Sequence, residues 1–205
     1  MAALTKLPDG YTETQRFSFE SGRLLFWLNI AALVPVALFG AAMLALSAWY
    51  LSIGAPLALP ILNRRLLSPG FDLPALIALL VLLVLPLHEL CHGLAFRLLG
   101  VGRVRYGIKL SRLVLYAAPA GAAYFRRDAF IAATLAPLAA ITLLGAAGLL
   151  FSPPGLHLFW ALAVALNAGG AVGDMAAVAL VRRYPPSTLV RDFGTAFAVY
   201  RIEQA

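Results

Sequence analysis

Long apolar segments constrain the fold of this chain more than any other feature of its sequence. The hydrocarbon core of a lipid bilayer is about 30 Å thick, which roughly 20 helical residues can cross. Four segments are long and apolar enough, and they run approximately over residues 24–51, 73–99, 129–151 and 156–181. Because backbone groups in lipid must bond within their own segment, these segments should be helices. The sequence therefore predicts an all-α polytopic membrane protein with about four transmembrane helices.

The composition agrees with this prediction and limits the possible partners. The 205 residues are 62% hydrophobic and 12% charged, whereas a soluble domain is about 25% charged. We expect a single integral membrane domain over residues 1–205, without a large additional soluble domain. The net charge of +7 would suggest nucleic acid for a soluble protein, but here it indicates basic side chains at the cytoplasmic leaflet. We therefore expect contact with membrane lipid and no nucleic-acid partner.

The basic residues are distributed unevenly among the connections. All sixteen Lys and Arg residues except Arg64 and Arg65 lie before the first segment, around the connection from the second to the third, or after the fourth. The turn over residues 152–155 carries none. Because basic connections stay in the cytoplasm, we expect both termini to be cytoplasmic. The stretch from Ala55 to Leu67 could be a re-entrant or interfacial segment, and the sequence leaves this open.

The sequence also predicts a small amount of β-structure. Residues 100–127 partly alternate apolar residues with basic or small ones, which is typical of a short hairpin at the cytoplasmic membrane surface. Residues 182–205 are expected to form a small soluble tail, in which residues 197–202 could be one further strand.

The second apolar segment contains the motif His88-Glu89-Leu90-Cys91-His92. The two histidines are four residues apart, so they lie on one helix face and can bind one metal ion. Glu89 is placed to accept a proton from a metal-activated water. Ionisable side chains inside a bilayer are costly and therefore indicate a functional site. The motif predicts one Zn²⁺ per chain, with Glu89 as the general base. Cys91 points away from His92 and is expected to be a packing residue, and no second cysteine is present for an intrachain disulfide.

A hydrolytic zinc site needs a third protein ligand and keeps one position for water. The only glutamate after Glu89 is Glu203, almost at the C-terminus, and Leu98 occupies the position of the third histidine in a metzincin motif. Two of the three downstream aspartates have simpler explanations. Asp128 is beside two arginines, and Asp192 falls in the soluble tail.

Asp174 is the predicted third metal ligand because of its depth in the membrane. It lies in the fourth apolar segment, which runs in the same direction as the second. At about 1.5 Å per residue, Asp174 and His92 both lie roughly 10–12 Å from the cytoplasmic ends of their segments. A metal ion would compensate the charge of Asp174 in the bilayer. The alternative is an interhelical hydrogen bond or a pair with Arg97.

Asn167 is a candidate catalytic residue with two interpretations. It lies seven residues before Asp174, and in a continuous helix it would share the face of that residue. Its amide could donate a hydrogen bond to a substrate carbonyl or an oxyanion. It could equally hold two membrane helices together, and the sequence leaves both roles open.

These residues resemble the intramembrane zinc peptidases of the site-2 protease class, which carry HExxH on one transmembrane helix and a ligating Asp on a later one. The chain is also similar to a family of small bacterial membrane proteins described as putative zincin peptidases, a family defined by a domain of unknown function. In that family, HExxH is followed by a helix with Asn and Gly-Asp and by a short C-terminal strand. The matching positions are His88, Glu89, His92, Asn167 and Gly173-Asp174. This resemblance implies a location in the bacterial inner membrane.

The sequence therefore predicts a membrane-embedded zinc metallopeptidase that cleaves membrane or membrane-proximal peptides. The hairpin after Gly100 could receive an unwound substrate by strand addition. One alternative is a non-catalytic metal-binding scaffold or regulator, but Glu89 would have no purpose in a purely structural site. Another is a metal or ion transporter, which would need further acidic or basic residues in the outer halves of the segments. The sequence has only His157 there, at the start of the fourth segment, where it is expected to be an interfacial residue.

Overall fold

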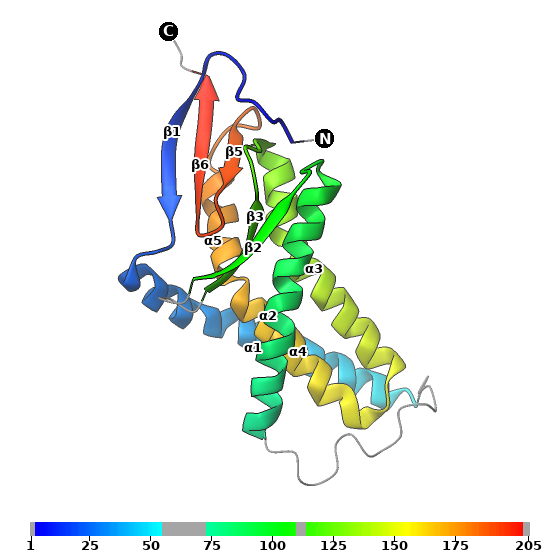
Figure 1. Cartoon of the computed structure of the whole chain (residues 1–205). Helices are drawn as coiled ribbons and strands as arrows, with labels where there is room; N and C mark the ends of the chain where they lie inside the picture. The colour runs from blue at the N-terminus through cyan, green and yellow to red at the C-terminus, as the bar shows by residue number, and fades with distance from the viewer. Residues whose placement is uncertain (1–2, 55–72, 110–113, 203–205) are drawn as a thin grey trace. The chain divides into compact units, whose positions relative to one another are not determined.

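The computed structural model describes residues 3–54, 73–109 and 114–202, and within them the chain forms five α-helices (Figure 1). Their bounds are α1 (Gly22–Ser52), α2 (Leu73–Leu98), α3 (Arg127–Phe151), α4 (His157–Gly170) and α5 (Val172–Val181), with a short 3-10 turn η1 (Pro154–Leu156) before α4. Helices α1, α2 and α3 are long and apolar enough to cross a membrane. A fourth crossing is counted if η1, α4 and α5 act as one bent span. These helices are those expected of a membrane protein.

The predicted fourth helix is broken, which corrects the expectation of one continuous segment. Helix α4 ends at Gly170 and α5 begins at Val172, with a bend of 44° between them. Glycine is a poor helix former, and the break directly follows Gly169 and Gly170. A side chain at Gly169 would meet Val36 Cγ2 at 2.6 Å. Gly169 therefore also allows α4 to pack closely against α1, as small residues do in membrane helices.

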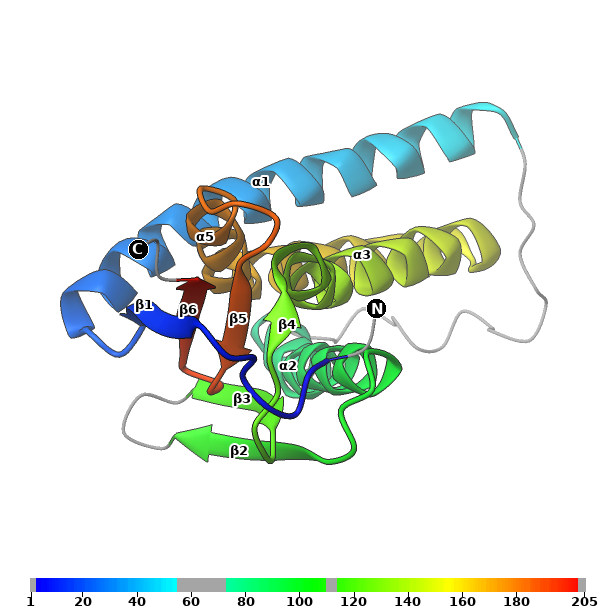
Figure 2. The same cartoon turned by 90° about the horizontal axis from the view of Figure 1, so that it is seen from above.

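The fold is not all-α, because the described residues also form two antiparallel sheets (Figure 2). Strands β1 (Tyr11–Ser18), β4 (Phe125–Arg126), β5 (Leu189–Asp192) and β6 (Ala196–Ile202) make a four-stranded sheet in the order β1-β6-β5-β4. Strands β2 (Val104–Lys109) and β3 (Val114–Pro119) form a separate hairpin. The predicted hairpin and C-terminal strand are confirmed. The prediction missed the other three strands, and the stretch from Ala55 to Leu67 lies outside the described residues.

The chain divides into two compact units. The first contains residues Met1–Leu28, Leu87–Pro137 and Gly173–Ala205. It includes both sheets, the C-terminal part of α2, the beginning of α3 and almost all of α5. Its core is built mainly from aromatic and β-branched side chains, among them Phe96, Phe125, Phe130, Val190, Phe197 and Val199. This core fixes the end of α2 that carries the HExxH motif against the strands.

The second unit contains residues Asn29–Pro86 and Leu138–Val172. Two apolar clusters hold it together, one around Met43, Leu149, Ala161 and Val164 and the other around Leu76, Leu80, Val84 and Ala163. His157 at the start of α4 is buried in this unit, and its Nδ1 lies 2.7 Å from Ser47 Oγ. His157 therefore makes an internal polar contact within this unit.

Candidate metal centre

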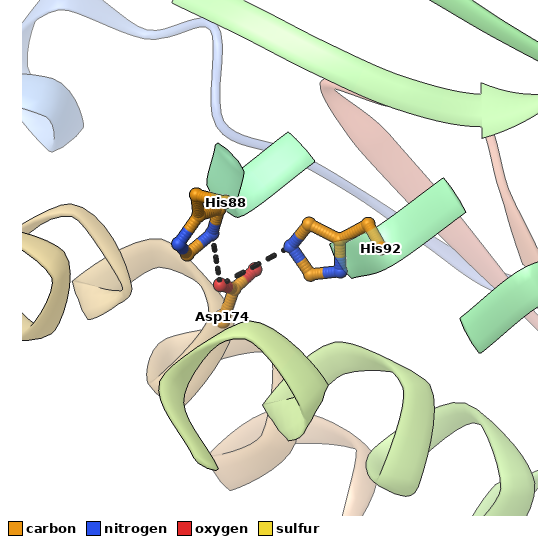
Figure 3. Close-up of side chains that lie close together, drawn as sticks. All are labelled: His88, His92 and Asp174. Carbon is orange, nitrogen blue, oxygen red and sulfur yellow. Dashed lines mark hydrogen bonds and ion pairs between the residues drawn. The ribbon is translucent and has the colours of Figure 1, made fainter. Parts of the chain in front are cut away.

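Three side chains of the first unit converge on one point (Figure 3). His88 and His92 come from the C-terminal half of α2, and Asp174 comes from the first turn of α5. His88 Nε2 lies 3.0 Å and His92 Nε2 lies 3.4 Å from the same oxygen, Asp174 Oδ2. One donor atom from each residue can be chosen so that all three lie within 4.8 Å of one another. The structure thus brings together the three ligands that the sequence predicts.

The helix spacing explains how the two imidazoles meet the carboxylate. Residues four apart on a helix lie one above the other on the same face. The rings of His88 and His92 are accordingly in contact, with centroids 4.9 Å apart and planes at 74°. Both side chains are buried, at 6% and 9% exposure. Asp174, by contrast, owes its position to the start of the new helix α5 and not to a continuous fourth segment.

A second contact orients His92. Its Nδ1 lies 3.2 Å from the carbonyl oxygen of Ala133 on α3. When Nδ1–H donates to that carbonyl, Nε2 is left unprotonated and faces Asp174, which is the usual arrangement of a metal-binding histidine. The ring of His92 also stacks on Phe96, with centroids 6.3 Å apart. His92 is therefore held in place by α3 and by the core of its own unit.

The donor set fits a zinc ion. Two imidazole nitrogens and one carboxylate oxygen, with room for water, make up a common catalytic zinc site. Ligands about 2.1 Å from one tetrahedral centre lie roughly 3.4 Å apart, and the two distances to Asp174 Oδ2 are 3.0 and 3.4 Å. The donor types and the two distances to Asp174 therefore fit a zinc ion held by His88, His92 and Asp174.

Glu89 is positioned by the β2–β3 hairpin as well as by its helix. Its carboxylate accepts a hydrogen bond from the backbone N–H of Ala117 in β3. Nothing in the sequence motif indicates this contact. The Ala120 N–H donates to the Arg103 carbonyl, and hydrogen-bonded pairs alternate along an antiparallel ladder. The backbone groups of the even-numbered residues in β3 therefore bond to β2. The backbone N–H and C=O groups of the odd-numbered residues, including Ala117, therefore point away from β2.

No further carboxylate of the described residues joins the three candidate ligands. Asp128 accepts a hydrogen bond from Arg127 Nε at 2.8 Å, as its sequence position suggests. Asp174 contacts the two histidines, whereas Arg97, its alternative partner, is exposed.

Asp192 lies closer to the centre than a residue of a soluble tail would. It is partly buried at the end of β5, and its Oδ1 accepts a hydrogen bond from the Gly194 N–H at 2.6 Å. Burial raises the pKa of Asp192 to about 6, while the nearby His92 opposes this rise.

Asn167 is separated from Asp174 by the helix break. It is buried in α4, at 1% exposure, and its carbonyl accepts a hydrogen bond from the N–H of Ala171. Because the helix does not continue through Ala171, the expected shared face of Asn167 and Asp174 does not follow from helical periodicity. The catalytic role of Asn167 stays a prediction.

Comparison with known proteins identifies one family. A family model described as "Putative zincin peptidase" matches residues 81–189, which is more than half of the chain. The matched range contains every residue predicted for the site, namely His88, Glu89, His92, Asn167 and Asp174. Searches of curated proteins and of solved structures gave no match.

Proposed function

The chain belongs to the putative zincin peptidase family, and on that premise we propose that it is a membrane-embedded zinc metallopeptidase. Its substrates would be peptide segments in the membrane or next to it. The observation that carries the proposal is the meeting of His88, His92 and Asp174 at one point, with Glu89 on the same helix. A purely structural zinc site would have four protein ligands and no general base. This difference favours catalysis over a scaffold role.

The proposed chemistry divides among the four residues. His88, His92 and Asp174 would hold one Zn²⁺ per chain. The ion, when bound, would lower the pKa of a water toward about 7 and polarise the scissile carbonyl. Glu89 would accept a proton from the attacking water and then donate it to the leaving nitrogen. The N–H of Ala117, which already bonds to the Glu89 carboxylate, would keep that carboxylate in position through both transfers.

The outer edge of β3 is the proposed binding surface for the substrate main chain. Leu115, Ala117 and Pro119 alternate along this edge, which no strand of the described residues pairs with. A helix hides its peptide carbonyls, so a substrate must be extended before it can be cleaved. An extended peptide can add to an open strand edge, and here the edge begins beside Glu89.

The proposed location is the bacterial inner membrane, with both termini in the cytoplasm. The distribution of Lys and Arg supports this orientation. It would place the metal centre toward the cytoplasmic side, since the HExxH motif lies in the half of α2 that leads to the basic connection.

A Glu89→Gln variant tests the function. The purified protein in detergent should carry about one zinc per chain and cleave casein, an unfolded polypeptide that offers extended segments. Glu89→Gln should keep its zinc and lose cleavage, because an amide cannot accept the proton. Cleavage by Glu89→Gln at the wild-type rate would contradict the proposed mechanism. A zinc-loaded wild type that cleaves neither casein nor membrane-embedded peptides would favour the scaffold alternative.

A further inference from the structure

Gly93 makes room for a tyrosine hydroxyl beside the metal centre. It directly follows His92 and lies four residues after Glu89, so it shares the helix face of Glu89, one turn further along. A side chain at this position would begin 1.9 Å from Tyr106 Oη and 2.6 Å from Tyr106 Cζ. The phenol end of Tyr106 therefore occupies the space that any other residue at this position would fill.

The hairpin register places Tyr106 beside Glu89 independently. Tyr106 in β2 lies directly opposite Ala117 in β3. Because the Ala117 N–H points away from β2, the two residues form a non-hydrogen-bonded pair, with Cα atoms only about 4.5 Å apart. The same Ala117 N–H reaches the Glu89 carboxylate. Contacts from the helix and from the hairpin thus agree on the position of the tyrosine.

Tyr106 combines partial exposure of the residue with an unbonded hydroxyl in the described part of the chain. The side chain is 47% exposed, and among the described residues its hydroxyl has no hydrogen-bond partner. Other tyrosines of this unit donate to protein oxygens, as Tyr11 does to Ser187 and Tyr200 does to Glu13. A phenol hydroxyl can donate one hydrogen bond.

The outer edge of β3 offers few free N–H donors, and the Tyr106 hydroxyl could supply a further hydrogen-bond donor. Of its three outward positions, Pro119 has no N–H, and the N–H of Ala117 is already bonded to Glu89. Only Leu115 has an outward N–H left for a substrate carbonyl. A peptide lying along this edge would therefore leave a main-chain carbonyl near Glu89 without a backbone donor.

We propose that Tyr106 contacts the substrate directly, and that its hydroxyl donates a hydrogen bond to a main-chain carbonyl next to the scissile bond. The proposal rests on the peptidase function proposed above. Gly93 is then required because it lets the hydroxyl end of Tyr106 reach α2, one helical turn after the general base. The residue selects for an extended peptide backbone and not for a particular side chain.

Two hydroxamates separate this contact from metal binding. Acetohydroxamate offers only a zinc-binding group, whereas benzyloxycarbonyl-Gly-Leu-hydroxamate adds main-chain carbonyls. With the zinc-loaded protein in detergent, Tyr106→Phe should weaken binding of the peptidyl probe by about 3- to 10-fold, as expected for one neutral hydrogen bond. Binding of acetohydroxamate, zinc content and melting temperature should stay unchanged.

Two further variants act as controls. Tyr116→Phe changes the same group on the other face of the hairpin, where the ring packs over Gly107 and Gly194, and it should leave both affinities unchanged. Gly93→Ala should displace the phenol and weaken the peptidyl probe at least as much as Tyr106→Phe.

Several outcomes would overturn the proposal. Three of them concern Tyr106→Phe: an unchanged affinity for the peptidyl probe, an equal loss of affinity for both probes, or a loss of zinc. The fourth is a wild-type protein that binds the two probes equally tightly. Failure of the proposed peptidase function would be seen in other measurements, as a wild-type protein without zinc or as cleavage by Glu89→Gln.

Discussion

Asp174 is the residue that turns two helix histidines into a candidate metal centre. Its Oδ2 is within 3.4 Å of both Nε2 atoms, and the carboxylate is mostly enclosed. An unpaired carboxylate in an apolar helix is costly, so such a residue normally has a charged partner or a ligand. His88 and His92 are neutral when they act as ligands, and a bound cation is then what balances the charge of Asp174.

Removing Asp174 should therefore remove the metal. We expect zinc in Asp174→Ala to fall below about a tenth of the wild-type content, since losing a ligand costs more than the roughly 10- to 100-fold loss seen for outer-shell partners. Asp128→Ala is the matched control, because Asp128 pairs with Arg127 and lies outside the ligand set. Atomic absorption on the purified variants measures both. Full zinc content in Asp174→Ala would refute the ligand role.

The sequence predicts which residues meet at the candidate metal centre better than it predicts their surroundings. The spacing of His88 and His92 and the depth of Asp174 are properties of helices, which can be derived from residue number alone. The contacts of Ala117 with Glu89 and of Tyr106 with Gly93 depend on the register of a hairpin. A shift of one residue would turn each side chain to the opposite face, so alternation in the sequence could not have identified either contact.

Asp192 should make the metal-free protein sensitive to pH. Its pKa is about 6 in the folded protein against an ordinary 3.8, so the folded state binds the proton more tightly than the unfolded state. Between about pH 4 and pH 6, stability should therefore fall as pH rises, and the loss should be complete above pH 6. Asp192→Asn keeps the oxygen that accepts from the Gly194 N–H and removes the titration.

The measurement compares melting temperatures of the two metal-free proteins in detergent from pH 4 to pH 8. The melting temperature of Asp192→Asn should rise relative to that of the wild type up to about pH 6, and the difference should then stay constant. Groups that do not interact with Asp192 titrate equally in both proteins, so the difference reports Asp192 together with the groups coupled to it, such as His92. A difference that does not vary with pH would show that Asp192 keeps an ordinary pKa.

At the scale of elements, helices were predictable and most strands were not. Runs of more than 20 apolar residues identified α1, α2 and α3 to within about two residues at each end, which is the usual uncertainty of helix boundaries. Strand β1 is mostly exposed at the edge of its sheet, so it lacks an alternating apolar pattern. Strand β4 has two residues. Its pairing with β5 depends on tertiary structure, which a local sequence pattern cannot predict.

The turn between β5 and β6 should tolerate only glycine at position 194. Gly194 has φ +96°, and a side chain there would lie 2.6 Å from Tyr116 Cδ2 in the hairpin. We expect Gly194→Ala to lower the free energy of unfolding by about 1–2 kcal/mol, from the left-handed backbone conformation alone. Displacement of the Tyr116 ring would add to this.

Gly121→Ala provides the control for this substitution. Gly121 has no atoms within 4 Å of an added side chain and no positive φ, so the change should be nearly neutral. Denaturant unfolding of both variants in the same detergent measures the difference. Equal stability of the two variants would mean that neither the backbone conformation nor the tyrosine contact restricts position 194.

At the scale of the whole molecule, the distribution of basic residues along the chain agrees with the placement of the candidate metal ligands. Basic residues follow α2 and α5, the two helices that carry the candidate metal ligands, and the connection before α4 has none. A peptidase with this arrangement would meet its substrate from the cytoplasmic side of the membrane. The depth match of His92 and Asp174 holds only if the second and fourth segments run in the same direction through the membrane.

Single-cysteine labelling tests the orientation directly. In a Cys91→Ser background, Pro154→Cys in η1 and Ser187→Cys after α5 introduce exposed positions on opposite sides of the predicted fourth crossing. A membrane-impermeant maleimide added to intact cells should label position 154 and not position 187, and both should react after the membrane is opened. The reason is the positive-inside rule, since Arg182 and Arg183 stand between α5 and position 187. Labelling of both positions in intact cells, or of position 187 alone, would overturn the topology. The depth argument that first singled out Asp174 would then lose its basis, and zinc analysis of Asp174→Ala would have to decide the ligand on its own.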